Sequence, residues 1–199
     1  MKTLSRSLVL IFFLTIVVSC EEKKEAYSDK EAEESKMLSL QESQKRGEYL
    51  VTVIGCDHCH SPKKMTDKGP ISDPDRWLMG HPADSPVPEI PEDAVGPGKW
   101  MLMHNDLTIS VGPWGVSFGA NLTPDDTGIG TWSFEQFKKA MTEGKYKGMD
   151  NSRPIMPPMP WESFKNLTEE DLRAIYDYLK SIKPIENVVP AYIPPAQTE

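Results

Sequence analysis

The sequence predicts a mostly α-helical domain, and two observations carry that prediction. Three segments place apolar residues at the spacing of amphipathic helices, and these are residues 38–54, 132–141 and 168–182. No run of alternating apolar and polar residues is long enough to predict a β-sheet. We therefore expect three main helices around a shared core, joined by loops.

The first predicted helix, residues 38–54, opens the domain, and Gly55 ends it because glycine commonly terminates helices. The apolar residues expected on its buried side are Leu40, Tyr49, Leu50 and Val53. In the second helix, residues 132–141, Ser133 followed by Gln136 predicts a capping box. Gly144 predicts the end of that helix.

The third predicted helix, residues 168–182, has the clearest boundaries of the three. Thr168 or its neighbour caps it, and three acidic residues follow at the positive end of the helix dipole. Pro184 prevents the helix from continuing. Its apolar face consists of Leu172, Ile175, Tyr176 and Leu179.

The N-terminus predicts export from the cytoplasm. Lys2 and Arg6 precede an apolar run at residues 8–18, which is too short for a comfortable membrane span, and Cys20 follows. We interpret residues 1–19 as a secretory signal peptide whose end resembles the bacterial lipobox, in which Cys20 carries lipid. An uncleaved anchor helix with an incidental Cys20 is the alternative. Both interpretations place the protein body outside the cytoplasm.

The predicted mature chain is acidic and divides into three parts. Residues 20–37 form a flexible charged tether, residues 38–190 a single domain, and residues 191–199 a C-terminal tail. Without residues 1–19 the formal charge changes from −8 to −10. Such a chain is poorly suited to nucleic acid, whose phosphates require a basic surface, and better suited to a partner with a basic patch.

Residues 56–60 carry the most informative motif, Cys56-Asp57-His58-Cys59-His60, which is the attachment signature for c-type haem. In a helix, residues i, i+3 and i+4 share a face, so Cys56, Cys59 and His60 point to one side. The two thiols then form thioether bonds to one haem, and His60 becomes the proximal iron ligand. The motif occurs once, which predicts one haem.

Two other uses of the cysteines fit less well. A thioredoxin-like pair normally follows a strand, whereas the segment before Cys56 is predicted to be helical. A structural zinc site needs four ligands, and His81 and His104 are the remaining histidines outside the motif. We expect both of these to be loop residues. Haem attachment is therefore the favoured interpretation.

Residues 61–118 form a long segment rich in proline and tryptophan without a clear secondary-structure pattern. Long structureless segments in a compact domain are uncommon unless they are functional. We expect an ordered wrap over the haem, with a short hairpin near residues 100–109.

Four stretches give the chain a family resemblance. They are residues 46–50 leading into the C-x-x-C-H motif, residues 121–132, residues 153–161 (RPIMPPMPW), and residues 167–183. Together they resemble class I c-type cytochromes. The likeness is greatest to the monohaem and dihaem cytochrome subunits that accompany bacterial alcohol and aldehyde dehydrogenases. It covers most of residues 44–60 and 119–190, and residues 61–118 depart from it as a long insertion.

The resemblance implies a cytochrome c fold of three main helices around one covalent haem. It also implies that Met159 is the sixth iron ligand, with Met156 as its rival. The flanking prolines restrict the loop and help a weak thioether ligand to stay in place. Further implied roles are a Pro62 carbonyl that accepts from His60, packing of Trp132 and Trp161 near the porphyrin, and a helix crossing at Gly47 opposite Ile175 and Tyr178.

These observations predict a single-electron carrier rather than an enzyme. Lipid on Cys20 would tether it in the periplasm or on the surface of a bacterium. Its expected partners are an extracytoplasmic dehydrogenase and a respiratory acceptor, such as an oxidase or another cytochrome. The alternative is a haem enzyme or gas-binding sensor whose sixth position is open or is filled by His81 or His104.

Overall fold

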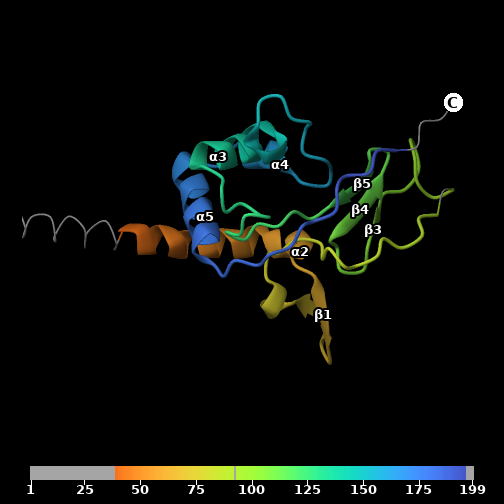
Figure 1. Ribbon diagram of the computed structural model, residues 1–199, viewed down its shortest axis with the longest axis horizontal. Helices are drawn as coiled ribbons and strands as arrows, with labels where there is room; N and C mark the ends of the chain where they lie inside the picture. Colours follow the sequence, from red (N-terminus) through yellow and green to blue (C-terminus); the bar gives the residue numbers. More distant parts are fainter. Residues whose placement is uncertain (1–38, 92, 196–199) are drawn as a thin grey trace, which may run out of the picture. The chain divides into compact units, whose positions relative to one another are not determined.

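The computed structural model describes residues 39–91 and 93–195 (Figure 1). The predicted signal peptide at residues 1–19, Cys20 and the tether at residues 20–37 lie outside the described residues. The described residues from Ser43 onward form one unit, to which the contacts below belong. No helix in the described ranges combines the length and apolar character needed to cross a membrane.

Helices make up the larger part of the regular structure, which confirms the predicted class in outline. A helix over residues 39–54 comes first. The further helices are α2 (Cys56–His60), α3 (Phe134–Glu143), α4 (Trp161–Phe164) and α5 (Glu169–Ser181), with single 3-10 turns η1 (Pro74–Arg76) and η2 (Tyr146–Gly148).

The helix of residues 39–54 crosses α5 at Gly47 (Figure 1). A Cβ atom at Gly47 would lie 1.9 Å from the carbonyl oxygen of Ala174 and 2.7 Å from Cβ of Tyr178, so only glycine permits this approach. The crossing selects which face is buried, and it contains Gly47, Leu50 and Val51. The prediction that Leu40, Tyr49 and Val53 are buried is wrong, since these side chains are 45%, 57% and 58% exposed.

The predicted ends of α3 and α5 are confirmed. Ser133 and Gln136 form the capping box of α3, and Gly144 ends that helix in a left-handed conformation with φ of 65°. Thr168 caps α5 by accepting from the backbone N–H of Asp171. On the predicted apolar face, Leu172, Ile175 and Leu179 are buried, and the half-buried Tyr176 donates its hydroxyl hydrogen to the carbonyl of Trp132.

Residues 61–118 contain two small antiparallel sheets. The first is the hairpin of β1 (Lys63–Thr66) and β2 (Gly69–Ser72). The second has the order β3-β4-β5, from β3 (Leu102–Met103), β4 (Ile109–Gly112) and β5 (Gly115–Phe118). The β3–β4 pair includes the hairpin expected near residues 100–109, whereas the other pairings had no counterpart in the prediction.

The C-terminal segment returns to this second sheet. Ile193, in the predicted tail of residues 191–199, forms an antiparallel bridge with Val116 of β5, with N–H···O distances of 2.8 Å and 3.1 Å. Gly115 has φ of 98°, and a Cβ atom there would lie 2.1 Å from the carbonyl oxygen of Ile193. The described part of the tail therefore lies directly against the sheet.

Candidate functional site

The C-x-x-C-H motif forms a short helix of its own, α2, directly after the helix of residues 39–54. Gly55 connects the two helices with φ of 77°, a left-handed conformation that glycine adopts without strain. A Cβ atom at Gly55 would also lie 2.7 Å from Nδ1 of His58. The predicted helix end at Gly55 is confirmed, and it fixes where α2 begins.

His60 is held by the backbone of a distant segment. Its Nδ1 lies 2.8 Å from the carbonyl oxygen of Ala120. Because a carbonyl only accepts, Nδ1 carries the hydrogen and the lone pair of Nε2 stays available for a metal. Burial lowers the pKa of His60 by more than the Ala120 carbonyl raises it, so the ring is neutral near pH 7.

The prediction that the Pro62 carbonyl accepts from His60 is wrong. That carbonyl instead accepts from the backbone N–H of Asp73 at 2.9 Å, at the base of the β1–β2 hairpin. Gly119 brings Ala120 to the histidine, because a Cβ atom at Gly119 would lie 2.0 Å from the carbonyl oxygen of Cys59. The only signal in the sequence is that Ala120 immediately precedes one of the four family-like stretches.

The β1–β2 hairpin braces α2, a role that sequence reasoning missed. Nζ of Lys63 donates to the carbonyls of Asp57, His58 and Ser61 at 3.2, 2.8 and 2.6 Å, which satisfies the end of the short helix. The hydroxyl of Ser72 donates to a carboxylate oxygen of Asp57 at 2.6 Å. A basic residue just beyond a helix end was the available signal.

The two thiols are poorly suited to thiolate chemistry in the unmodified chain. Burial, followed by the charge of Asp57, raises the pKa of Cys56 to about 11. Burial also raises the pKa of Cys59, although Lys63 opposes the shift. Reactive redox cysteines have lowered pKa values, so this environment disfavours a thioredoxin-like pair. Among the described residues, no three His, Cys, Asp or Glu side chains form a group that could hold a metal ion.

Met159 lies in the proline-rich loop between η2 and α4, and its carbonyl accepts from the backbone N–H of Trp161 at 3.0 Å. The preceding Pro157–Pro158 peptide bond is cis. Met159 and Cys56, more than a hundred positions apart, both pack against the main cluster of buried residues, as do Trp77 and Trp132. Met156 is half-buried and is not among the described residues packed against that cluster.

The remaining histidines take part in a polar network inside the 61–118 segment. The ring of His81 is fully buried, with Nδ1 2.7 Å from Oγ1 of Thr108 and Nε2 3.3 Å from the carbonyl oxygen of Ser85. Asp106 accepts from the Thr108 hydroxyl at 2.8 Å and lies 2.6 Å from Nδ1 of His104. Each nitrogen of His81 therefore lies within hydrogen-bond distance of a polar atom, and both histidines lie outside helices and strands, as expected for loop residues.

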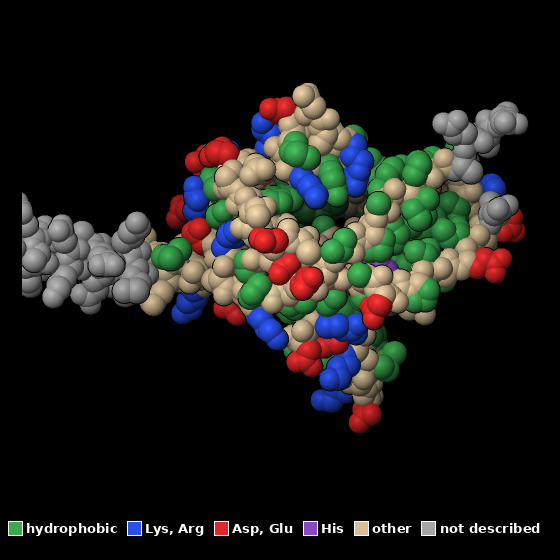
Figure 2. Space-filling model, viewed as in Figure 1, with side chains coloured by type: hydrophobic (Ala, Val, Ile, Leu, Met, Phe, Trp, Pro, Cys, Tyr) green, Lys and Arg blue, Asp and Glu red, His purple; other side chains and the backbone are tan. Residues whose placement is uncertain are grey.

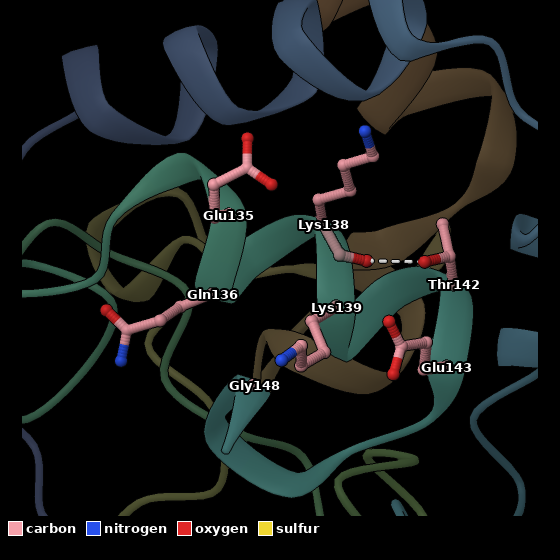
Figure 3. A pocket seen from close by; sticks show the side chains of 7 residues that line it. All are labelled: Glu135, Gln136, Lys138, Lys139, Thr142, Glu143 and Gly148. Atoms are coloured by element: carbon pink, nitrogen blue, oxygen red, sulfur yellow. Dashed lines mark hydrogen bonds between the residues drawn. The ribbon is translucent and has the colours of Figure 1, made fainter. Parts of the chain in front are cut away.

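A depression lined by residues of α3 and by Gly148 of η2 contains no residue of the motif (Figure 3). Its lining consists of Glu135, Gln136, Lys138, Lys139, Thr142, Glu143 and Gly148. This charged lining does not suit an apolar macrocycle. By contrast, Figure 2 shows the molecular face hollowed between the lobe of α3 and α4 and the three-stranded sheet, with hydrophobic side chains along the hollow.

The chain belongs to the cytochrome c family, whose pattern matches residues 44–183. The match begins inside the first helix and includes the whole C-x-x-C-H motif, the Met159 loop and α5. Members of this family carry haem c, bound covalently, with its iron, and this chain is a haem c protein.

Curated relatives support the same affiliation. The chain is 41% identical to a component of the nicotinate dehydrogenase of Pseudomonas putida over 80 residues, which are 40% of this chain and 6% of the relative. It is 29% identical to the gluconate 2-dehydrogenase cytochrome c subunit of Pantoea cypripedii over 135 residues, which are 67% of this chain and 22% of the relative. It is 37% identical to the cytochrome c subunit of the quinone alcohol dehydrogenase of Gluconacetobacter polyoxogenes over 75 residues, 37% of this chain and 15% of the relative. The chain thus matches less than a quarter of the length of each of these relatives.

The residues present fit a covalent haem. The cysteines share one side of α2 with a neutral histidine whose Nδ1 is already engaged, and Cys56 borders the apolar cluster. A thioether would form by adding the S–H group of each cysteine across a vinyl group of the haem, so raised pKa values that keep the Cys56 and Cys59 thiols protonated are compatible with attachment.

Proposed function

We propose that this chain is a monohaem c-type cytochrome that transfers single electrons. In this proposal Cys56 and Cys59 hold the haem through thioether bonds, and His60 is the proximal iron ligand. The contact between Nδ1 of His60 and the carbonyl of Ala120 supports that role, because it fixes the tautomer and the ring orientation.

Met159 is the proposed distal ligand, and one observation carries this assignment. Met159 and Cys56 pack against the same cluster of buried residues, although the chain separates them by the whole insertion and α3. Met156 lacks that contact among the described residues and stays the rival ligand.

The chain's own residues would then perform three tasks. Cys56 and Cys59 would attach the cofactor, His60 would present a neutral nitrogen to its iron, and Met159 would supply the second protein ligand. When bound, haem c supplies a one-electron redox couple. If His60 and Met159 both ligate the iron, the protein would leave no position for a substrate, which is why we propose a carrier rather than an enzyme.

The proposed setting is extracytoplasmic. Lipid on Cys20 would tether the domain of residues 38–190 through the charged segment of residues 20–37, after removal of residues 1–19. The proposed partners are a dehydrogenase that donates electrons and a respiratory acceptor. Support for the dehydrogenase comes from relatives that are named as subunits of nicotinate, gluconate and alcohol dehydrogenases.

The deciding experiment is the visible spectrum of the haem-loaded protein. Methionine ligation gives a weak long-wavelength band in the oxidised state, and Met159→Ala should abolish it. The reduced variant should also bind carbon monoxide rapidly, because a position on the iron becomes open.

Met156→Ala is the matched control, since it removes the other methionine of the same loop. It should retain the band. Loss of the band only in Met156→Ala would assign the ligand to Met156. A wild-type protein without the band, or with rapid carbon monoxide binding, would favour the haem enzyme or gas-binding sensor.

A further inference from the structure

The loop that carries Met159 can form few hydrogen bonds between its own backbone groups. Pro157, Pro158 and Pro160 have no N–H group, so this segment offers carbonyl acceptors and few donors. At its C-terminal end, the carbonyls of Met159 and Pro160 accept from Trp161 and Ser163 of α4. The Pro157 carbonyl, two residues before Met159, accepts from no backbone N–H of the described residues.

The donor to this carbonyl is a side chain of the three-stranded sheet of the insertion. The hydroxyl of Ser117, in β5, donates to the carbonyl oxygen of Pro157 at 2.6 Å. Its other neighbouring acceptor, the carbonyl of Ser110, is 3.4 Å away, so the single hydroxyl hydrogen goes to Pro157. Among the hydrogen bonds of the described residues, this is the one that joins residues 156–160 to the insertion.

The orientation of the Ser117 hydroxyl is itself fixed by the hairpin. The indole N–H of Trp114 donates to Oγ of Ser117 at 3.3 Å, which leaves the hydroxyl hydrogen to face Pro157. The Trp114 ring lies over Gly112, where a Cβ atom would come within 2.4 Å of the ring. Gly112 is therefore required for this arrangement.

The same hairpin reaches the start of the loop through the C-terminal segment. The hydroxyl of Tyr192 donates to the carbonyl of Trp114. The guanidinium of Arg153 lies 5.1 Å from the centre of the Tyr192 ring and 3.9 Å from that of Tyr146. Cation–π contacts at these distances are favourable, so the loop is held at two points, Arg153 and Pro157.

We propose that the three-stranded sheet of the insertion positions the loop of the distal ligand, with Ser117 as the positioning residue. This inference rests on the proposed function, in which Met159 ligates the iron. Holding the carbonyl of Pro157 limits how far the loop can move away, and thereby keeps a weak thioether ligand in place against competing ligands.

The test is imidazole binding to the oxidised, haem-loaded protein, because added imidazole competes with the methionine. Ser117→Ala is expected to raise the apparent affinity for imidazole about two- to tenfold, which is the effect of losing one hydrogen bond. Ser117→Thr retains a hydroxyl and should restore the wild-type imidazole affinity.

Ser110→Ala is the matched control. Ser110 is paired with Ser117 across the β4–β5 ladder, and its buried hydroxyl has no partner among the described residues. Its removal should leave imidazole affinity at the wild-type value. If Ser110→Ala raised the affinity as much as Ser117→Ala, a general loosening of the sheet would explain both results and overturn the proposal.

Trp114→Phe keeps an aromatic ring over Gly112 but removes the N–H that orients Ser117, so it should shift the affinity in the same direction by a smaller factor. It decides the question if Ser117→Ala does not fold. The proposal is refuted if the folded Ser117→Ala and Trp114→Phe variants bind imidazole with wild-type affinity, while the long-wavelength band is present in the wild type and lost in Met159→Ala. That result would leave the proposed function intact. Absence of the band from the wild type would refute the proposed function instead.

Discussion

The helical region and the inserted sheet region are stabilised in different ways. The main cluster contains eleven buried residues, and all of them except Leu78 come from outside residues 61–118. The cluster at the three-stranded sheet has three buried residues, Ile109, Val111 and Val116.

Polar contacts such as the His81–Thr108–Asp106 network lie around the cluster of the three-stranded sheet. Apolar packing is non-directional, whereas hydrogen bonds fix orientation. We therefore expect the sheet region to fix the orientation of particular groups, which include the neighbouring carbonyls of Ala120 and Pro157.

The surfaces of the two regions also differ (Figure 2). Hydrophobic side chains gather over the three-stranded sheet. Trp100 and Met101, just before β3, are 74% and 53% exposed, and Met103 of β3 is 39% exposed. Charged side chains are frequent around α3 and α5, where Arg46 pairs with Asp171 and Lys138 with Glu169. The described part of residues 61–118 contains five short strands and a 3-10 turn, and Trp100 contributes no buried packing to it; a wrap over the haem stays a prediction.

The largest loss of unfolding free energy is expected from a truncation in the main cluster. This truncation tests whether apolar packing is the main source of stability there. Ile175→Ala removes a side chain that is 2% exposed at the centre of α5, and should lower the unfolding free energy by about 2–5 kcal/mol. Val111→Ala in the sheet cluster should cost about 1–3 kcal/mol. Denaturant unfolding of the haem-loaded variants provides the comparison. A larger cost for Val111→Ala would contradict the distinction between the regions.

A smaller effect is expected from Asn187, which joins the C-terminal segment to the insertion. Its buried amide donates to the carbonyls of Met79 and His81 at 2.7 and 2.9 Å and accepts from the N–H of Ala83 at 2.9 Å. Asn187→Ala leaves these groups unpaired and should cost about 1–3 kcal/mol.

Hydrogen exchange of the Asn187→Ala variant shows where that loss is felt. Amides of the insertion, including Ala83, should exchange faster, whereas those of α5 should change little. If amide exchange became faster by the same factor in α5 and in the insertion, the two regions would unfold together. That result would contradict the distinction between the helical region and the sheet region.

The smallest effect is a pH dependence that belongs to the sheet region. Burial lowers the pKa of His81 below its ordinary value of 6.5, more than the Ser85 carbonyl and Asp106 raise it. The unfolded chain therefore takes up this proton first as the pH falls. The contribution of His81 is complete above about pH 6.5 and is lost progressively below it.

His81→Gln should flatten this part of the stability curve, as measured by denaturant unfolding between pH 7 and 5. Ile175→Ala serves as the control, because it should lower the whole curve without changing its slope in this range. If the unfolding free energy of His81→Gln fell with pH as steeply as that of the wild type, the buried His81 ring would not control the loss of stability below pH 6.5.

Local patterns were sufficient for the helical part of the fold. The capping residues Ser133 and Thr168, the ends at Gly55 and Gly144, and the face of α5 follow from short-range chemistry, and all were predicted. The buried face of the first helix was not, because the crossing at Gly47 turns Tyr49 and Val53 outward. Strands β1, β2 and β5 were missed because each contains only four residues.

The sequence by itself determined the cofactor chemistry, because Cys56, Cys59 and His60 lie within one turn of chain and their spacing alone places them on one face. It also supplied the candidates Met159 and Met156. Only the tertiary structure decided that Ala120 rather than Pro62 faces His60, and that Ser117 contacts the Met159 loop. These contacts join residues sixty and forty positions apart, and no local periodicity encodes such distances.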